Sequence, residues 1–249
     1  DLTSIDASQN IALTTLHCSS NEIVSLDLSQ NTALVELYCL WNDLATLDVS
    51  NNRALNTFRL TSNKLSSLDL SLNTALEWLD CDYNDLTNLD VSQNTALKIL
   101  ICAGNQLTRI DVSNNTSLDD LRCGHNPLSS LDVSQNASLT YLSCYENSLT
   151  SLDVTHNTAL TGIYCRTNQL STLDISQNPS LTYLNCSGNQ LTSLNVTPHT
   201  ALEELICNDN QLISLDLSQN TVLIELYCEN NQLRNLIVKN GNNHNFDYF

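Results

Sequence analysis

One spacing constrains this chain more than any other feature, because cysteine recurs every 21 residues. The ten cysteines fall at positions 18, 39, 81, 102, 123, 144, 165, 186, 207 and 228, and the single gap of 42 passes over Leu60. Counted from this column, a leucine lies five residues earlier and an asparagine three residues later in each of eleven units. A register kept over so many units indicates a repeat architecture, in which equivalent residues occupy equivalent places.

The unit reads L-x-x-L-x-C-x-x-N-x-L-x-x-L-D-V-S-x-N-x-A. In Leu34–Cys39, Leu37 and Cys39 alternate with polar positions, as in a strand with one buried face. The stretch Leu44–Val49 alternates again and predicts a second short extended segment. No unit contains a run of helical period long enough for a crossover helix. Because one unit cannot bury its own apolar face, neighbouring units must stack, and we predict a β-rich solenoid.

The pattern resembles the leucine-rich-repeat family, whose hallmark is L-x-x-L-x-L-x-x-N-x-L, with cysteine here in the place of the third leucine. Within that family, a 21-residue unit with a stacked cysteine is similar to the bacterial internalin class. Over residues 2–238 the resemblance implies a curved leucine-rich-repeat superhelix with a parallel β-sheet on its concave face, short extended segments on its convex face and essentially no α-helix. It also implies a secreted or cell-surface location and ligand binding on the concave face.

The register predicts a single leucine-rich-repeat domain over residues 1–249. Residues 1–12 form a partial N-terminal repeat, 13–238 form about eleven repeats of 21 residues, and 239–249 form a closing tail in which Phe246 covers the last core layer.

The net charge of −18, from 9 basic and 27 acidic residues, disfavours nucleic acid and anionic membrane surfaces as partners. No apolar run is long enough to cross a bilayer, so we predict no membrane insertion. We expect a soluble monomer.

The constant columns are predicted to be scaffold. The cysteines replace a core leucine, so we expect buried free thiols, with disulfides and a metal as the alternatives. The asparagine column from Asn21 to Asn231 is expected to satisfy backbone groups. The aspartate column that begins at Asp6 and Asp27 is expected to form Asx turns with the serine two residues later. A row of calcium sites is the alternative for this column. We predict no metal and no cofactor.

The variable columns are predicted to carry function. Positions three before, one before and two after each cysteine point outward from the sheet or its rim, and both tryptophans and seven of the eight tyrosines lie in these columns or beside them. Aromatic residues gathered on one face mark a binding surface, and cross-strand packing that stabilises the sheet is the alternative. The candidate ligand-binding residues are Tyr38, Trp41, Arg59, Trp78, Tyr83, Tyr141, Tyr145, Tyr164, Arg166, Tyr183 and Tyr227.

These candidates form two clusters along the sequence. In the first, Trp41 and Tyr83 flank Ser62, which is expected to leave a notch between the two rings. In the second, Gly162 is expected to leave a gap between Tyr141 and Tyr183. A third group is acidic and is expected to be a solvated face; its members are Glu204, Asp209, Glu225 and Glu229.

We therefore predict a non-catalytic binding or adhesion module of an exported bacterial surface protein that recognises a protein or glycan partner. The alternatives are a carbohydrate-specific binding domain and a structural spacer in a larger cell-surface protein. An enzyme is disfavoured because the thiols face inward and neither His17 nor His125 has a convincing catalytic partner.

Overall fold

The computed structural model describes residues 1–241, which contain short strands and no helix. The chain divides into two compact units, Asp1–Pro127 and Leu128–Phe249. The first unit contains β1 (Thr15–His17), β2 (Glu36–Tyr38), β3 (Thr57–Arg59), β4 (Trp78–Asp80), β5 (Ile99–Ile101) and β6 (Asp120–Arg122). The second contains β7 (Tyr141–Ser143), β8 (Gly162–Tyr164), β9 (Tyr183–Asn185), β10 (Glu204–Ile206), β11 (Ser214–Asp216), β12 (Glu225–Tyr227) and β13 (Asn235–Ile237).

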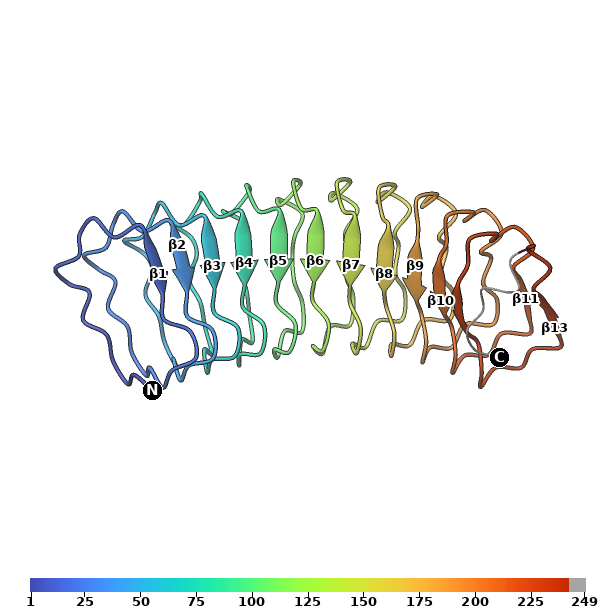
Figure 1. Cartoon of the computed structure of the whole chain (residues 1–249), viewed down its shortest axis with the longest axis horizontal. Coiled ribbons are helices and arrows are strands. Elements are labelled where there is room, and N and C mark those ends of the chain that lie inside the picture. The colour runs from blue at the N-terminus through green and yellow to red at the C-terminus, as the bar shows by residue number, and fades with distance from the viewer. Residues whose placement is uncertain (242–249) are drawn as a thin grey trace. The chain divides into compact units, whose positions relative to one another are not determined.

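Each unit is a parallel-strand solenoid (Figure 1). In the first unit β1 to β6 pair in chain order, and every strand residue lies opposite the residue 21 positions later, as Thr15 lies opposite Glu36. In the second unit β7 to β10 continue this pattern and β12 pairs with β10. The repeat length therefore sets the strand register, and the predicted leucine-rich-repeat solenoid is confirmed.

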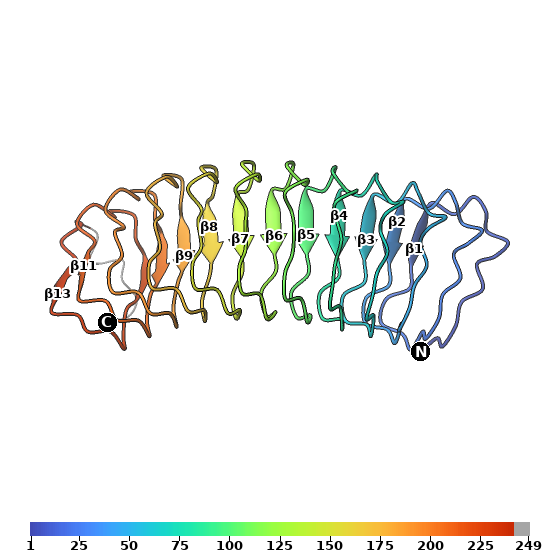
Figure 2. The same ribbon diagram turned by 180° about the vertical axis from the view of Figure 1, so that it is seen from behind.

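The opposite side of each turn is extended, as predicted, but it forms a strand ladder only near the end of the second unit. There β11 pairs with β13, with Leu215 opposite Leu236, and the two strands lie side by side in both ribbon views (Figures 1 and 2). In the other turns the equivalent stretch has no assigned strand. The side opposite the sheet therefore depends mainly on side chains to hold one turn to the next.

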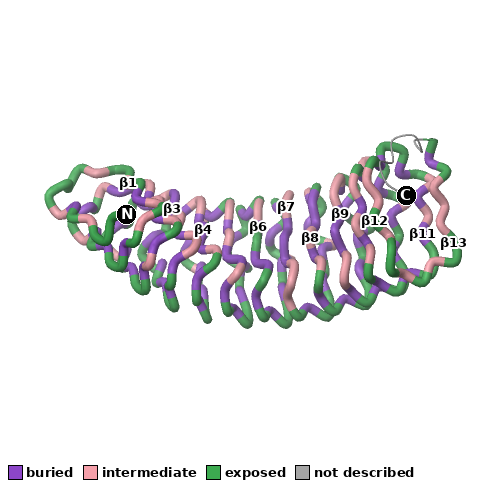
Figure 3. The backbone as a smooth tube through the Cα atoms, turned by 60° about the horizontal axis from the view of Figure 1, so that its bottom comes forward, coloured by how far each residue is buried: buried purple, intermediate pink, exposed green. Residues whose placement is uncertain are grey.

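Leucines form most of the core, joined in nearly all turns by a buried cysteine, and buried positions recur from turn to turn along the backbone (Figure 3). In β2 the central residue Leu37 is fully buried, whereas Glu36 and Tyr38 on either side are only half-buried. Cys39 and the later Leu44 and Val49 also point inward. Stacking like residues on like residues gives each turn two apolar neighbours, which a single turn could not provide for itself.

The cysteine column consists of free thiols, as predicted, and nine of the ten are buried while Cys228 is half-buried. Burial in apolar surroundings raises the pKa of Cys18 to about 11 and the pKa values of Cys123 and Cys165 to about 12. Leu60, the residue at the skipped position, is buried in the same way. The thiols are therefore protonated packing groups.

The asparagine three residues after each cysteine fastens one turn to the preceding one. The Nδ2 group of Asn42 donates to the carbonyl oxygens of Cys18 (3.0 Å) and Cys39 (3.3 Å), while its Oδ1 accepts from the N–H of Ile23 at 3.0 Å. The same three kinds of bond recur at Asn63 and Asn84. The predicted backbone role of this column is confirmed.

A second asparagine column, which the sequence reading had not separated, holds the opposite side of the turns. Asn94 is fully buried, and its Nδ2 donates to the carbonyl oxygens of Leu70 (3.1 Å) and Asn73 (2.9 Å) in the preceding turn. One position of this column is His199, whose Nε2 lies 2.9 Å from the carbonyl oxygen of Ile175. This buried ladder takes the place of strand pairing on that side of the solenoid.

The aspartate column forms the expected Asx turns. The Oδ1 atoms of Asp48 and Asp90 each accept the N–H of the serine two residues later at 2.9 Å, and Asn195 makes the equivalent bond to Thr197 at 3.2 Å. These bonds lower the pKa values of Asp48 and Asp90. Within residues 1–241 no group of three or more His, Cys, Asp or Glu is arranged to hold a metal ion.

Most of the predicted closing tail, including Phe246, lies outside the described residues.

Asn94→Ala should destabilise the chain, because two buried carbonyl groups lose a hydrogen-bond donor and the core loses volume. We expect a decrease of about 2 kcal/mol in the free energy of unfolding, measured by urea denaturation. Gln93→Ala is the matched control, because Gln93 is the exposed neighbour and its truncation should change stability by less than about 0.5 kcal/mol. Equal effects of the two substitutions would contradict the ladder's role.

The native thiols should resist Ellman's reagent at mildly alkaline pH, because only the thiolate reacts and burial keeps the thiols protonated. Cys228 should react first because it is half-buried, and all ten should react once the chain is unfolded in urea. Absorbance of the released thiolate measures the count. Rapid labelling of several cysteines in the folded protein would show that the column is not closed to solvent.

Candidate binding surface on the sheet

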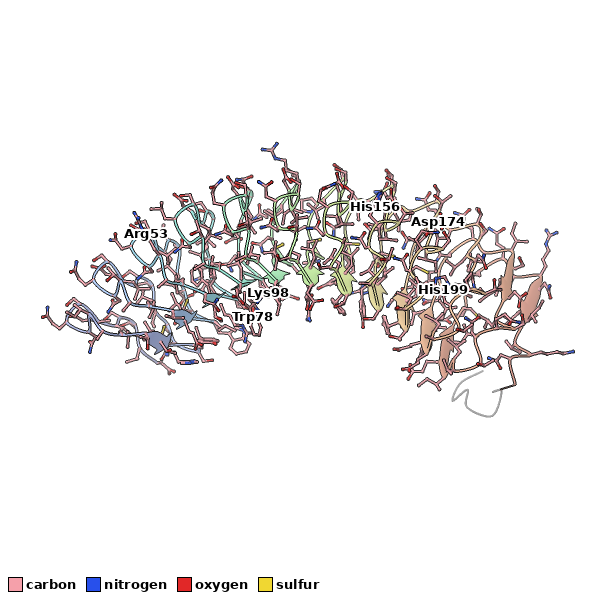
Figure 4. The ribbon with its side chains drawn as sticks, turned by 90° about the horizontal axis from the view of Figure 1, so that it is seen from above. Arg53, Trp78, Lys98, His156, Asp174 and His199 are labelled. Carbon is pink, nitrogen blue, oxygen red and sulfur yellow. The ribbon has the colours of Figure 1, made fainter. Side chains whose placement is uncertain are left out.

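The outward-pointing side of the strands is called the sheet face. It comprises the first and third residues of each strand from β1 to β10 and β12. It also includes the two residues that follow each column cysteine. Side chains at the first and third strand positions point away from the core because strand residues alternate. Figure 4 shows Trp78 and Lys98 on the side of the strands and Arg53 on the opposite side of the same unit. This face carries all eleven of the predicted ligand-binding residues.

The second residue after each column cysteine adopts left-handed backbone geometry. Trp41 has φ of 50° and Tyr83 has φ of 49°, and the glycines of the column, Gly104 and Gly188, have φ of 61° and 63°. Glycine, asparagine and aspartate adopt this geometry with least strain, whereas a bulky side chain is strained by about 1–3 kcal/mol. Trp41 and Tyr83 are nevertheless 59% and 53% exposed, so burial of their rings does not offset much of that strain.

In the first unit a charged network holds the ring of Trp78 beside these residues. The guanidinium of Arg59 lies over the Trp78 ring, 5.0 Å from its centroid, and pairs with Asp80 through Nε (3.1 Å) and Nη2 (3.0 Å). Thr61 donates its hydroxyl to the other oxygen of Asp80 at 2.5 Å. Because Asp80 is almost fully buried, its two contacts fix the orientation of Arg59 and with it the Arg59–Trp78 stack.

The rings of Tyr38 and Tyr83, also in the first unit, each pack against a neighbouring turn. Tyr38 stacks on His17 with ring centroids 4.1 Å apart and an interplanar angle of 5°. The ring of Tyr83 lies over Gly104, where a Cβ atom would come within 2.6 Å of Tyr83 Cδ1. Tyr83 thus leans away from Ser62, so its ring is not the wall of the notch that its sequence spacing suggested.

The structure disfavours ionisation of the Asp82 carboxyl group, which follows β4. Its Oδ1 accepts the backbone N–H of Ala103. Burial and the nearby charge of Asp80 nonetheless raise the pKa of Asp82 to about 7. The first cluster therefore carries a group that changes charge near neutral pH.

In the second unit the tyrosines pack against one another. Tyr164 stacks on Tyr183 at 4.1 Å between ring centroids and meets Tyr141 at 4.9 Å in a tilted arrangement. A Cβ atom on Gly162 would lie 3.3 Å from the Tyr141 ring and 3.5 Å from the Tyr164 ring. The gap expected at Gly162 is therefore filled by tyrosine rings, as the cross-strand packing alternative predicts.

Arg166 repeats the arrangement of Arg59. Its guanidinium lies 4.6 Å from the centroid of the Tyr145 ring, and its Nη1 pairs with Glu146 at 2.7 Å. Tyr227, the remaining candidate, is 36% exposed at the end of β12.

The structure brings some of the candidates into contact within each unit. Arg59 lies over Trp78 in the first unit, and the second unit has the Tyr141–Tyr164–Tyr183 stack and the Arg166–Tyr145 pair. The remaining candidates lie on the same face of their unit. Sequence reasoning missed the left-handed geometry beneath Trp41 and Tyr83. A signal was present, because the same column contains Gly104, Gly188 and Asn230. It also missed the support that Asp80 and Thr61 give to Arg59.

The sheet face presents rings, guanidinium groups and carboxylates, and the column thiols lie beneath it. Within the described part of the chain no helix is long and apolar enough to cross a membrane.

The parallel strands, the asparagine ladders and the buried cysteine column define a leucine-rich-repeat protein. No protein-family profile and no curated protein matches this chain, but solved structures do. The functional domain of InlJ from Listeria monocytogenes, which includes a cysteine ladder, is 40% identical with a TM-score of 0.93; the match covers 97% of this chain and 57% of that one. This chain is therefore similar to the internalin class of leucine-rich-repeat proteins.

Two further structures are similar. A leucine-rich-repeat protein of Leptospira interrogans is 29% identical with a TM-score of 0.84, and the match covers 91% of this chain and 63% of that one. The internalin InlF of Listeria monocytogenes shares the fold at 20% identity and a TM-score of 0.76, over 96% of this chain and 87% of that one. This chain thus spans less than two thirds of the first two structures.

Asp82→Asn should stabilise the chain more at pH 8 than at pH 4. Because folding raises the pKa of Asp82 to about 7, the folded state loses stability as pH rises from the unfolded value, near 4, through 7. The amide can still accept the Ala103 N–H but carries no charge. We expect a gain of about 1–2 kcal/mol at pH 8 and little at pH 4, measured by urea unfolding. An equal effect at both pH values would contradict this charge change.

Proposed function

We propose that this chain is a non-catalytic binding domain of an exported bacterial surface protein and that it recognises a protein partner through the sheet face of its first unit. The observation that carries the proposal is the placement of Trp41 and Tyr83. Both rings are more than half exposed, and both stand on backbone that a glycine or asparagine would adopt with less strain. If these positions served only the stability of the fold, glycine or asparagine there would give a more stable chain.

The neighbouring residues suit a protein interface. Trp, Tyr and Arg are the residues most enriched at interface positions that dominate binding energy. Asp80, itself bonded by Thr61, holds Arg59 over the Trp78 ring. Next to them β5 presents Ile99 and Ile101, both half-buried on the sheet face. An apolar centre with preorganised charged groups at its edge is typical of a protein-binding site.

The same proposal includes a lack of catalytic activity and a location at the cell surface. The thiols are buried with raised pKa values, which makes them poor nucleophiles. The similarity to the functional domain of InlJ from Listeria monocytogenes supports an exported bacterial protein. A monomer is expected, and light scattering coupled to size-exclusion chromatography measures its mass.

The double substitution Trp41→Asn/Tyr83→Asn should separate binding from stability. The labelled domain is applied to an array of extracellular proteins and to an array of glycans. We expect a protein signal that the double variant weakens by about tenfold or more. Its free energy of unfolding should stay equal or rise by about 1 kcal/mol, because asparagine relieves the backbone strain.

Ser62→Asn is the matched control, because Ser62 has φ of 57° in the same column but carries no ring. It should leave the array signal unchanged. A signal confined to the glycan array would favour the carbohydrate-specific alternative. An intact signal in the double variant would remove these rings from the interface and would favour a spacer.

A further inference from the structure

The sheet face of the second unit places two carboxyl groups side by side within a long stretch of sequence that lacks basic residues. Between Arg166 and Arg234 the sequence contains no lysine or arginine, although it contains seven acidic residues. Two of these, Glu204 and Glu225, lie directly opposite each other on β10 and β12. Both are half-buried, and no described residue forms an ion pair with either. Like charges directly opposite each other destabilise a sheet.

Elsewhere on the sheet, aspartates at the outer strand positions have an arginine partner. On β6, Arg122 at the third position pairs with Asp120 at the first position at 2.7 Å. On β3 and β4, Arg59 pairs with Asp80 across the strands at 3.0 Å. The residue that corresponds to Arg122 and Arg59 on β10 is Ile206. Burial, a hydrogen bond between the two glutamate side chains and the charge of Glu225 raise the pKa of Glu204.

Aromatic rings flank the two glutamates. Tyr183 on β9 lies opposite Glu204, and Tyr227 on β12 lies opposite Ile206. The protein twice combines a ring, a carboxylate and a guanidinium: Arg59 with Trp78 and Asp80, and Arg166 with Tyr145 and Glu146. The strands β9, β10 and β12 present the rings and the carboxylates, and none of their residues is a lysine or arginine.

We propose that the sheet face of β9, β10 and β12 binds an arginine side chain of a protein partner between the carboxylates of Glu204 and Glu225 and the flanking tyrosine rings. The proposal rests on the proposed function, since it treats the sheet face as a binding surface, but it names a second contact in the other unit. Arginine fits better than lysine because its planar guanidinium can pair with two carboxylates while its face stacks on a ring. It is an alternative to the expectation that this acidic group is only a solvated face.

The test uses acetylated tetra-arginine amide as the probe and measures its affinity for the full chain by titration calorimetry at low ionic strength. Glu204→Gln/Glu225→Gln should weaken binding by about tenfold or more, because both carboxylates lose their charge. The matched control is Asp153→Asn/Asp174→Asn, which removes the same charge from the opposite side, where Figure 4 shows Asp174. Asparagine at Asn195 already makes this Asx turn, so the control should fold, and it should weaken binding by less than about twofold.

A variant that gives the two glutamates an arginine within the chain provides a second measurement. Ile206→Arg places a guanidinium where Arg122 stands on β6, so it should occupy the site from within. We expect it to weaken probe binding by about tenfold and to raise the melting temperature by a few degrees, roughly the effect of one well-formed ion pair. Circular dichroism confirms that each variant is folded.

Equal weakening by the two charge variants would overturn the proposal, because the probe would then respond only to net charge. Failure of the intact chain to bind the probe, or equally tight binding of tetra-lysine, would overturn it as well. The Trp41→Asn/Tyr83→Asn variant should bind the probe like the unsubstituted chain. A failure of the proposed function on the arrays is therefore distinguishable from a failure of this site.

Discussion

The hydrogen bonds that asparagine side chains donate to the main chain of the preceding turn are the interaction on which the rest of this structure depends. Each turn has only three strand residues, so strand pairing alone leaves most of its backbone groups without partners. Main-chain bonds outside the strands, such as the one from the Ser20 N–H to the Leu40 carbonyl oxygen, satisfy some of these groups. Two asparagine ladders satisfy others, one after the strand, represented by Asn42, and one on the opposite side, represented by Asn94. Both ladders need an amide at the same place in every turn, and a constant repeat of 21 residues supplies it.

A fixed register divides the residues into those that the fold specifies and those that it leaves open. The leucine, cysteine and asparagine columns are buried and touch equivalent residues in neighbouring turns, so a change there disturbs packing on both sides. The sheet-face columns touch solvent, and the fold asks of them little more than a strand conformation or, after the cysteine, left-handed backbone. Chemistry that departs from what the fold prefers, such as Trp41 in that left-handed position, therefore needs an explanation outside the fold.

The sequence predicts the constant columns of this structure well. Because the repeat length is fixed, residues of one column share the same surroundings in every turn. The strand positions, the free buried cysteines and the Asx turns of the aspartates follow from alternation and spacing, and all were confirmed. The directions of the outer side chains do not follow from the period. Tyr83 lies over Gly104 because glycine leaves space there, and Tyr164 covers Gly162 for the same reason. These placements depend on which residue types are neighbours at the variable positions, and the repeat pattern does not specify those residue types.

The two units contain carboxylates on the sheet face that differ in whether they have arginine partners, and this difference bears on the function of that face. In the first unit Asp80 and Asp120 have arginine partners, so the exposed rings of Trp41 and Tyr83 lie near a largely neutralised network. In the second unit Glu204 faces Glu225 without one. Repulsion between adjacent half-buried carboxylates and strain beneath exposed rings both lower the stability of the folded chain. A spacer gains nothing from either, whereas a binding surface recovers both when a partner covers the rings and brings a cation to the glutamates.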